Sequence, residues 1–251
     1  MNKPFDINKV KNSSLEIEMN SLLYDETDSP YKYDNRGVPR VTEILSLMLH
    51  EEYLMGWANF IGRTKKISHT ILSENAANIG TRVHAAIEQY LSNGIEEDFS
   101  DIMIKEDRNK MNNAFLSFKR WWSIIAQNNY KIIFLEKTLV NNYFGGTLDM
   151  LIEINNRLYI VDFKTSNHFN YKYHLQTSAY RRLLYDNYRI LVDGVIILKL
   201  SKVNILFQEQ VLDLSDFNTL EYMNNCDNCF MSLVYSYYNR RLIESDYNNY
   251  K

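Results

Sequence analysis

The stretch FGGTLDMLIEINNRLYIVDFKTSNHFNYKYHLQTSAY, residues 144–180, decides how the rest of the chain is arranged. Apolar side chains alternate with other residues from Leu148 to Ile154, and an almost continuously apolar run covers Leu158 to Lys164. These patterns predict two strands, the second covered on both faces. Between them stand Asn155 and Asn156, and asparagine tolerates the positive φ of a two-residue type I′ turn. We therefore expect a β-hairpin, followed by a helix from about Tyr173.

The predicted turn fixes which residues face each other across the hairpin. It places Asp149 directly opposite Asp162, about 5 Å apart at Cβ. Lys164 shares their face because side chains alternate along a strand. Two carboxylates in a mostly buried sheet cost stability unless one takes up a proton or a cation bridges them. Carboxylate oxygens suit Mg²⁺ or Mn²⁺, so a divalent metal is the expected cation.

The order of these residues resembles the PD-(D/E)XK nuclease superfamily, and most of all its RecB-like exonucleases. The residues that carry the resemblance are GGTLD, then DFK, then Gln176 and Tyr180 four apart on a helix. It also takes in Gly80-Thr-Arg-Val-His84 upstream and, more loosely, Val41-Thr-Glu-Ile-Leu45 with Trp57. A lone D-x-K tripeptide arises easily by chance, whereas the ordered set is far more specific.

The resemblance implies a fold and a set of roles. The fold is an α/β restriction-endonuclease-like core, a mixed central sheet flanked by helices, with an N-terminal helical elaboration. One or two Mg²⁺ or Mn²⁺ ions are expected on His84, Asp149, Asp162 and the backbone carbonyl of Phe163. Lys164 acts with Asp149 and Asp162 in catalysis, and Gln176 and Tyr180 face the nucleic acid.

Two glutamates are auxiliary candidates. Residues 132–140 predict the first strand of the sheet, and a turn at Asn142-Tyr143 places Glu136 opposite Asp149. A bulge at Gly145-Gly146 would shift that pairing by one residue. Glu88 lies one helical turn after His84 on the predicted helix 71–91, where it could orient the histidine or line the groove.

Other residues could contact nucleic acid. Arg63, Lys65 and Lys66 form the clearest basic cluster, for which a solvated loop and a phosphate-contacting loop are equally good interpretations. Arg181 follows Tyr180 and is a further candidate. On the predicted helix 107–127, the segment Lys119–Trp122 mixes basic and aromatic residues; we expect the aromatics in the core, with a base-stacking platform as the alternative.

The chain divides by pattern into four segments, expected to form one compact unit. They are an N-terminal arm (1–30), a helical region that carries His84 (31–128), the catalytic sheet and helix (129–213), and a C-terminal helical segment (214–251). Within them, residues 195–200 and 203–211 predict a last hairpin around Ser201-Lys202, and the polar C-terminal end is expected to fray.

Composition limits the function classes. The 251 residues carry a formal net charge of −3, which argues against coating duplex DNA by charge alone but is compatible with a nuclease whose acidic site offsets basic patches. The two cysteines, Cys226 and Cys229, exclude a disulfide scaffold and cannot supply four ligands, so no iron–sulfur cluster is expected. No segment approaches about 18 uninterrupted apolar residues, so we expect no membrane contact and an intracellular, cytoplasmic protein. Abundant Asn, Tyr, Ile and Lys are typical of an AT-rich genome such as that of a phage.

The sequence therefore favours a metal-dependent deoxyribonuclease. The resemblance favours an exonuclease on single-stranded DNA ends or flaps, in replication, recombination or repair. The alternatives are a structure-specific endonuclease and a non-catalytic nucleic-acid-binding protein of the same fold.

Overall fold

The computed structural model describes residues 29–48 and 69–249. The elements in chain order are β1 (Lys32–Tyr33), β2 (Arg36–Gly37), α2 (Val41–Met48), α4 (His69–Asn93), α5 (Lys105–Ile125), β3 (Tyr130–Val140), β4 (Gly145–Ile154), β5 (Arg157–Lys164), α6 (Tyr171–Tyr188), β6 (Gly194–Leu200), β7 (Phe207–Asp213) and α7 (Phe217–Asn249). Among these, no helix is long and apolar enough to cross a membrane.

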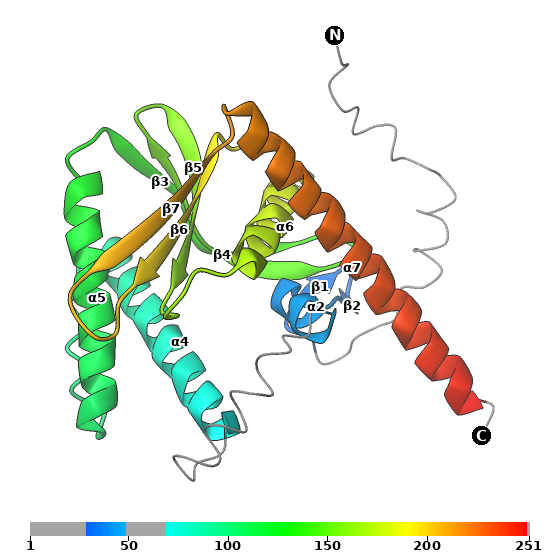
Figure 1. The fold of residues 1–251 in the computed structure, drawn as a ribbon, viewed down its shortest axis with the longest axis horizontal. Coiled ribbons are helices and arrows are strands. Elements are labelled where there is room, and N and C mark those ends of the chain that lie inside the picture. The colour runs from blue at the N-terminus through cyan, green and yellow to red at the C-terminus, as the bar shows by residue number, and fades with distance from the viewer. Residues whose placement is uncertain (1–28, 49–68, 250–251) are drawn as a thin grey trace.

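A five-stranded sheet stands at the centre, in the order β3-β4-β5-β6-β7. β5 and β6 run parallel, and the other neighbours are antiparallel. Figure 1 shows α4 and α5 on one side of this sheet and α6 and α7 on the other. The predicted mixed central sheet flanked by helices is confirmed.

Each face of the sheet has its own hydrophobic core. Phe118, Trp121 and Phe163 lie in the core beneath α4 and α5, whereas Leu183 and Phe230 lie in the core beneath α6 and α7. β5 supplies buried residues to both, as its nearly continuous apolar sequence requires. A strand between two helical layers places its polar side chains at its ends, which is where Asp162 and Lys164 stand.

The hairpin of β4 and β5 has the predicted register and turn. Ile154 pairs with Arg157, and the φ values of Asn155 and Asn156 are 51° and 63°, as a type I′ turn needs. The β3–β4 register is also the one predicted with Asn142-Tyr143 in the turn. The suspected bulge is absent from the glycines of this hairpin and lies instead between Ile132 and Phe134.

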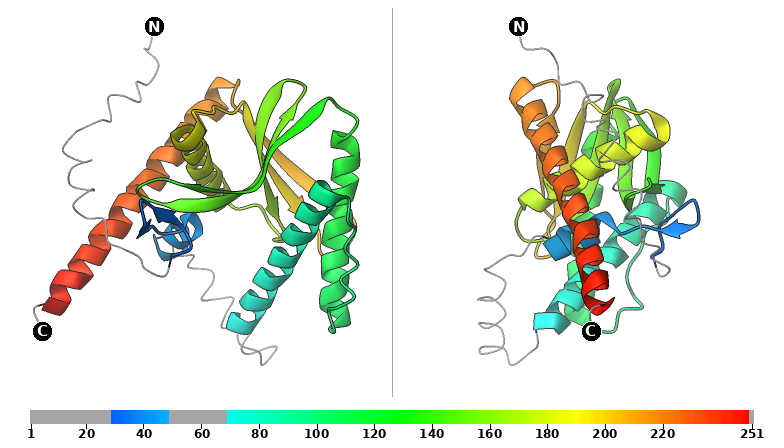
Figure 2. Two further views of the ribbon diagram at one scale, coloured as in Figure 1. Left: turned by 180° about the vertical axis from the view of Figure 1, so that it is seen from behind. Right: turned by 90° about the vertical axis from the view of Figure 1, so that its right-hand side faces the viewer.

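Two boundaries were predicted wrongly. β7 begins at Phe207 and not at Val203, because Ser201 N donates to Leu206 O at 3.0 Å and the six residues between β6 and β7 form a loop. The C-terminal helix continues to Asn249, beyond the end near Glu244 that the sequence pattern predicts. Figure 2 shows its second half projecting past α2, away from the sheet.

Candidate active site

Asp149 lies where β4 leaves its pairing with both neighbours. The β4–β5 ladder ends one pair before Asp149 and Asp162, so the predicted apposition of these two residues is not made through the backbone. The β3–β4 ladder skips the pair Glu136–Asp149, although the residues on either side of it are paired. The carboxylate bridges the gap instead, because Asp149 Oδ2 accepts a hydrogen bond of 2.7 Å from the backbone N of Phe163. Asp149 thus stands in an opening between separating strands.

Glu136 marks the point where β3 and β4 change sides. In regular strands Leu135 and Leu139 would share a face, as would Leu148 and Met150. Here Leu139 and Leu148 join the core beneath α6 and α7, whereas Leu135 and Met150 face α4 and α5. The φ of Glu136 is 45°, in the left-handed region that costs a non-glycine residue about 1–2 kcal/mol. Strain of this kind concentrates at functional sites.

His84 reaches this opening from α4. Its Nε2 lies 3.1 Å from the carbonyl oxygen of Phe163, and its Nδ1 lies 3.4 Å from Asp149 Oδ1 and 3.7 Å from Glu136 Oε1. The imidazole therefore joins a helix to three strands of the sheet.

Lys164 and Asp162 form a close pair on β5. Lys164 Nζ donates to Asp162 Oδ1 at 2.9 Å and lies 2.8 Å from Oδ2. The ammonium also lies 5.0 Å from the ring centroid of Tyr173 on α6. The charge of Asp162 is thus offset by a lysine of its own strand.

Charge and burial shift the pKa values of these groups in opposing ways. Burial lowers the pKa of His84, but the charge of Asp149 and hydrogen bonds with Asp149 and Glu136 outweigh burial and raise that pKa to about 10. Burial likewise raises the pKa of Asp149, but the charges of His84 and Lys164 and the amide of Phe163 give a net lowering. Asp149 is therefore an ionised carboxylate at neutral pH.

Asp162 behaves in the opposite way. Burial, together with the charge of Asp149, raises the pKa of Asp162 to about 6 despite the opposing effect of Lys164. Burial lowers the pKa of Lys164, but Asp162 and Asp149 raise it above its ordinary value, so the lysine is an ammonium ion at neutral pH.

The residues present fit a divalent metal ion. His84, Glu136 and Asp149 each offer a ligand atom, and these atoms all lie within 4.8 Å of one another. Asp162 Oδ2 is buried and accepts no hydrogen bond from the residues that the structure describes, although Lys164 is near it. Carboxylate oxygens in this number suit Mg²⁺ or Mn²⁺. The cluster contains Glu136, predicted only as auxiliary, and in the described structure Asp162 is turned toward Lys164.

Two tyrosines explain the glycine pair of β4. A Cβ on Gly145 would lie 2.6 Å from Tyr31 Cβ, and a Cβ on Gly146 would lie 2.7 Å from Tyr180 Cε1. Tyr31 Oη is 3.0 Å from Thr147 Oγ1, and Gln176 Nε2 donates to Tyr180 Oη at 2.9 Å. The absence of side chains on these glycines lets both rings approach the strand two to four residues before Asp149. No sequence pattern points to Tyr31, because it lies far from β4 along the chain.

The remaining predicted residues are placed as follows. Glu88 is half-buried on α4, and its charge helps to raise the pKa of Glu136. Arg181 interacts with Asp227 and Cys226 on α7 and not with the carboxylate cluster. Arg63, Lys65, Lys66 and Trp57 lie outside the described residues.

The base-stacking alternative on α5 is wrong. Trp121 and Trp122 are buried, and Trp121 Nε1 donates to Glu209 at 2.9 Å. Both rings belong to the core beneath α4 and α5.

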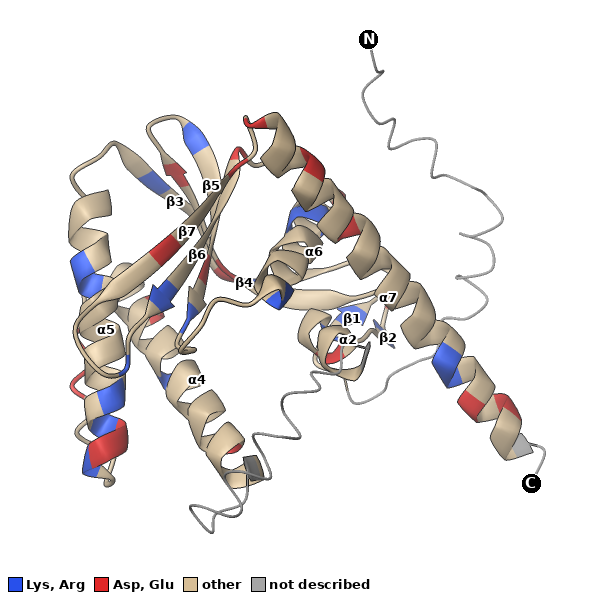
Figure 3. Ribbon diagram, viewed as in Figure 1, with Lys and Arg blue, Asp and Glu red and all other residues tan. Residues whose placement is uncertain are grey.

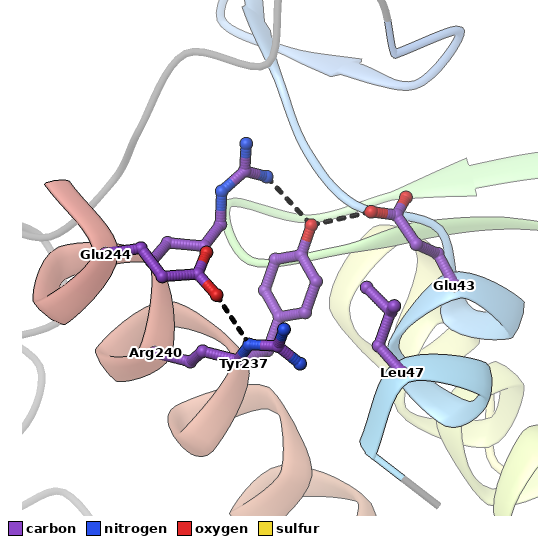
Figure 4. Close-up of a pocket in the computed structure, with 6 residues that line it drawn as sticks. Glu43, Leu47, Tyr237, Arg240 and Glu244 are labelled. Atoms are coloured by element: carbon purple, nitrogen blue, oxygen red, sulfur yellow. Dashed lines mark hydrogen bonds and ion pairs between the residues drawn. The ribbon is translucent and has the colours of Figure 1, made fainter. Parts of the chain in front are cut away.

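A pocket of about 240 Å³ lies apart from these residues, between α2 and α7. In Figure 4, Tyr237 points from α7 toward Glu43 of α2, and Arg240 points toward Glu244. Tyr237 Oη donates to Glu43 at 2.7 Å and accepts from Arg241 Nη1 at 2.8 Å. Because its polar lining groups bond to one another, the pocket joins two helices and lies apart from the cluster of His84, Glu136 and Asp149.

The arrangement defines a class of protein. A mixed sheet between helical layers carries acidic residues, a histidine and a lysine at the point where two central strands separate. Such a site offers the oxygen and nitrogen ligands and the charged groups that phosphodiester hydrolysis needs, so the class is a nuclease.

Comparison with known families agrees. A model of the PD-(D/E)XK nuclease superfamily matches residues 60–227, more than half of the chain. The protein belongs to the PD-(D/E)XK nuclease superfamily.

Two solved structures are weakly similar. A phage related exonuclease from Haemophilus somnus 129PT is 11% identical with a TM-score of 0.36, and the likeness covers 83% of this chain and 96% of that one. The protein SSO0001 is 11% identical with a TM-score of 0.33, over 89% of this chain and 88% of that one. Likenesses this low carry no argument about function. The search of curated proteins found no match.

Proposed function

We propose that the protein is a Mg²⁺- or Mn²⁺-dependent deoxyribonuclease that degrades DNA from single-stranded ends or flaps during replication, recombination or repair. The observation that carries the proposal is the meeting of His84, Asp149 and the Asp162–Lys164 pair where β4 and β5 separate. Membership of the nuclease superfamily supports the reaction class. The preference for single-stranded ends comes from the resemblance to RecB-like exonucleases.

Different residues of the chain would bind metal, position water and orient the DNA strand. Asp149, Glu136 and His84 would hold one or two divalent ions, with Asp162 and the Phe163 carbonyl as further ligands. A divalent ion supplies Lewis-acid polarisation of the scissile phosphate and lowers the pKa of water. Lys164 positions the attacking water and offsets the charge that develops on the phosphorus oxygens. Gln176 and Tyr180 hold the strand in line for attack.

Cleavage of matched substrates tests the proposal. The purified chain is incubated with Mn²⁺ or EDTA and with end-labelled linear single strands, linear duplex and covalently closed single-stranded circles. We expect degradation of linear single strands in Mn²⁺, no cleavage in EDTA, and intact circles. Digested circles would establish the endonuclease alternative instead, and no cleavage of any substrate would leave the non-catalytic binding protein.

A further inference from the structure

The loop that follows Lys164 exposes two aromatic rings beside the candidate active site. Phe169 is 37% exposed, and Tyr171, the first residue of α6, is 55% exposed. The core does not need either ring, since the helix packs through buried residues such as Leu175 and Ala179. Exposed aromatic rings in a short polar loop are available to stack on a ligand.

A lysine at the end of β6 lies next to this loop. Lys199 is the parallel-strand partner of Lys164, so the two backbones lie about 5 Å apart and both side chains point to the α6 side of the sheet. Figure 3 shows basic residues at the ends of the neighbouring strands β5 and β6. Lys199 Nζ donates to Asn167 O at 2.9 Å and lies 5.0 Å from the ring centroid of Phe169. Within residues 29–48 and 69–249, no carboxylate forms an ion pair with it.

Lys199 and the two rings share the chemistry of a single-stranded nucleic-acid site. Such sites combine cations that follow the phosphates with aromatic side chains on which unpaired bases stack. Asp162 and Lys164 lie at the end of β5, which leads into the loop. A DNA strand that lies over the two rings would therefore run directly to the candidate active site. Paired bases are already stacked in a duplex and cannot offer their faces to the rings.

We propose that Phe169 and Tyr171 stack on unpaired bases of the DNA strand while Lys199 contacts a phosphate next to the one that Lys164 approaches. This inference rests on the proposed function and adds to it the residues that select an unpaired strand. Binding of this kind tolerates different base sequences, because every base has a face on which a ring can stack.

Binding of two oligonucleotides in EDTA tests the inference without cleavage. Fluorescence anisotropy measures Kd for a labelled dT20 and for a base-free sugar-phosphate 20-mer with the same charge. The variants are Phe169→Ala, Tyr171→Ala, Tyr171→Phe and Lys199→Gln. The controls are Phe217→Ala, an aromatic residue exposed on α7, and Lys131→Gln, an exposed lysine at the far end of β3.

Each variant has its own expected result. Phe169→Ala and Tyr171→Ala weaken dT20 binding by roughly 5-fold or more each and leave the base-free chain unchanged. Tyr171→Phe keeps the ring and the affinity. Lys199→Gln weakens the binding of both oligonucleotides and lowers the slope of log Kd against log salt concentration by roughly 0.7. The two controls bind as the parent does.

Three other outcomes overturn the inference. If the alanine variants bind dT20 as tightly as the parent, the rings do not stack on bases. The same conclusion follows if these variants lose as much affinity for the base-free chain as for dT20. If Lys131→Gln lowers the salt slope as much as Lys199→Gln, Lys199 has no specific phosphate. In any of these cases, continued Mn²⁺-dependent cleavage of linear strands by the parent leaves the proposed function standing, whereas a parent that neither binds nor cleaves DNA refutes both.

Discussion

Lys164 combines burial, a cationic state and a position beside the carboxylates. Its side chain is 16% exposed and its ammonium lies 2.8 Å from Asp162. Lysine is a compact point charge on a flexible stem, suited to follow charge as it develops on a phosphate. We therefore propose that Lys164 acts in the chemical step and not in metal binding, because an ammonium ion cannot be a ligand.

Lys164→Ala should abolish cleavage while metal binding is retained. Loss of a group that stabilises the transition state lowers kcat by roughly 10² or more. Single-turnover cleavage in saturating Mn²⁺ measures the effect, with Lys131→Ala as the control lysine. A kcat within tenfold of the parent refutes the role.

The glycine pair gives a prediction about stability. Gly146→Ala forces the Tyr180 ring to move, because the new Cβ would lie 2.7 Å from it, and overpacking of this kind costs about 1–3 kcal/mol. Gly80→Ala on α4 is the matched control, since its Cβ would lie 3.4 Å from Thr165 Oγ1 and alanine favours a helix. Urea unfolding compares the two variants. Equal stability for both would show that Tyr180 is not held against β4.

The β4–β5 hairpin sets the position of the carboxylates, and its turn should control its stability. Asn156→Gly keeps the turn type and maintains or raises the free energy of unfolding, because glycine accepts a φ of 63° without cost. Asn156→Val places a β-branched residue in the left-handed region and lowers that free energy by about 1–2 kcal/mol. Thermal unfolding distinguishes them, and an unaffected valine variant would contradict the type I′ turn.

Regular pairing was predictable from sequence, whereas its interruption was not. Two asparagines between apolar runs specify a turn, and the turn specifies the register that places Asp149 and Asp162 at one end of the hairpin. The break at Glu136 arises because β3 and β4 must serve two cores on opposite faces of the sheet. Alternation along one strand carries no information about that tertiary requirement, so the sequence alone predicts only an auxiliary role for Glu136.

Long-range contacts were missed for the same reason. The pairing of Tyr31 with Thr147 and the placement of Phe169 over Lys199 depend on how separate segments pack. The histidine was found through the family resemblance, since a helical pattern alone does not separate a ligand from a surface histidine. Only the structure shows which groups surround its ring, namely Asp149, Glu136 and the Phe163 carbonyl.

Across the whole molecule, the buried charges of the site are partly offset by neighbouring side chains, and this bears on stability. The hairpin register alone predicts that Asp149 and Asp162 repel each other and that neutralising one is stabilising. In the structure Lys164 pairs with Asp162, and His84 lies beside Asp149. Burial and the charge of Asp149 nevertheless outweigh the lysine and raise the pKa of Asp162 to about 6, so the ionised carboxylate costs stability above that pH.

Asp162→Asn should therefore raise the melting temperature of the protein in EDTA at pH 8. A gain of about 1 kcal/mol corresponds to roughly 2–4 °C in a chain of this size. At pH 5 the difference should shrink, because Asp162 in the parent is then mostly protonated. A variant that melts below the parent at pH 8 would show that the pair with Lys164 dominates over burial and repulsion between the carboxylates.

Divalent-metal binding by the cluster of His84, Glu136 and Asp149 is most directly tested by calorimetric titration of Mn²⁺ into the metal-free protein. The parent should bind one or two ions, and Asp149→Asn should weaken binding by at least roughly tenfold, since even partners of metal ligands contribute that much. Asp101→Asn removes an exposed carboxylate paired with Arg82 and should bind as the parent does. Mn²⁺ binding by Asp149→Asn as tight as that of the parent would contradict the site.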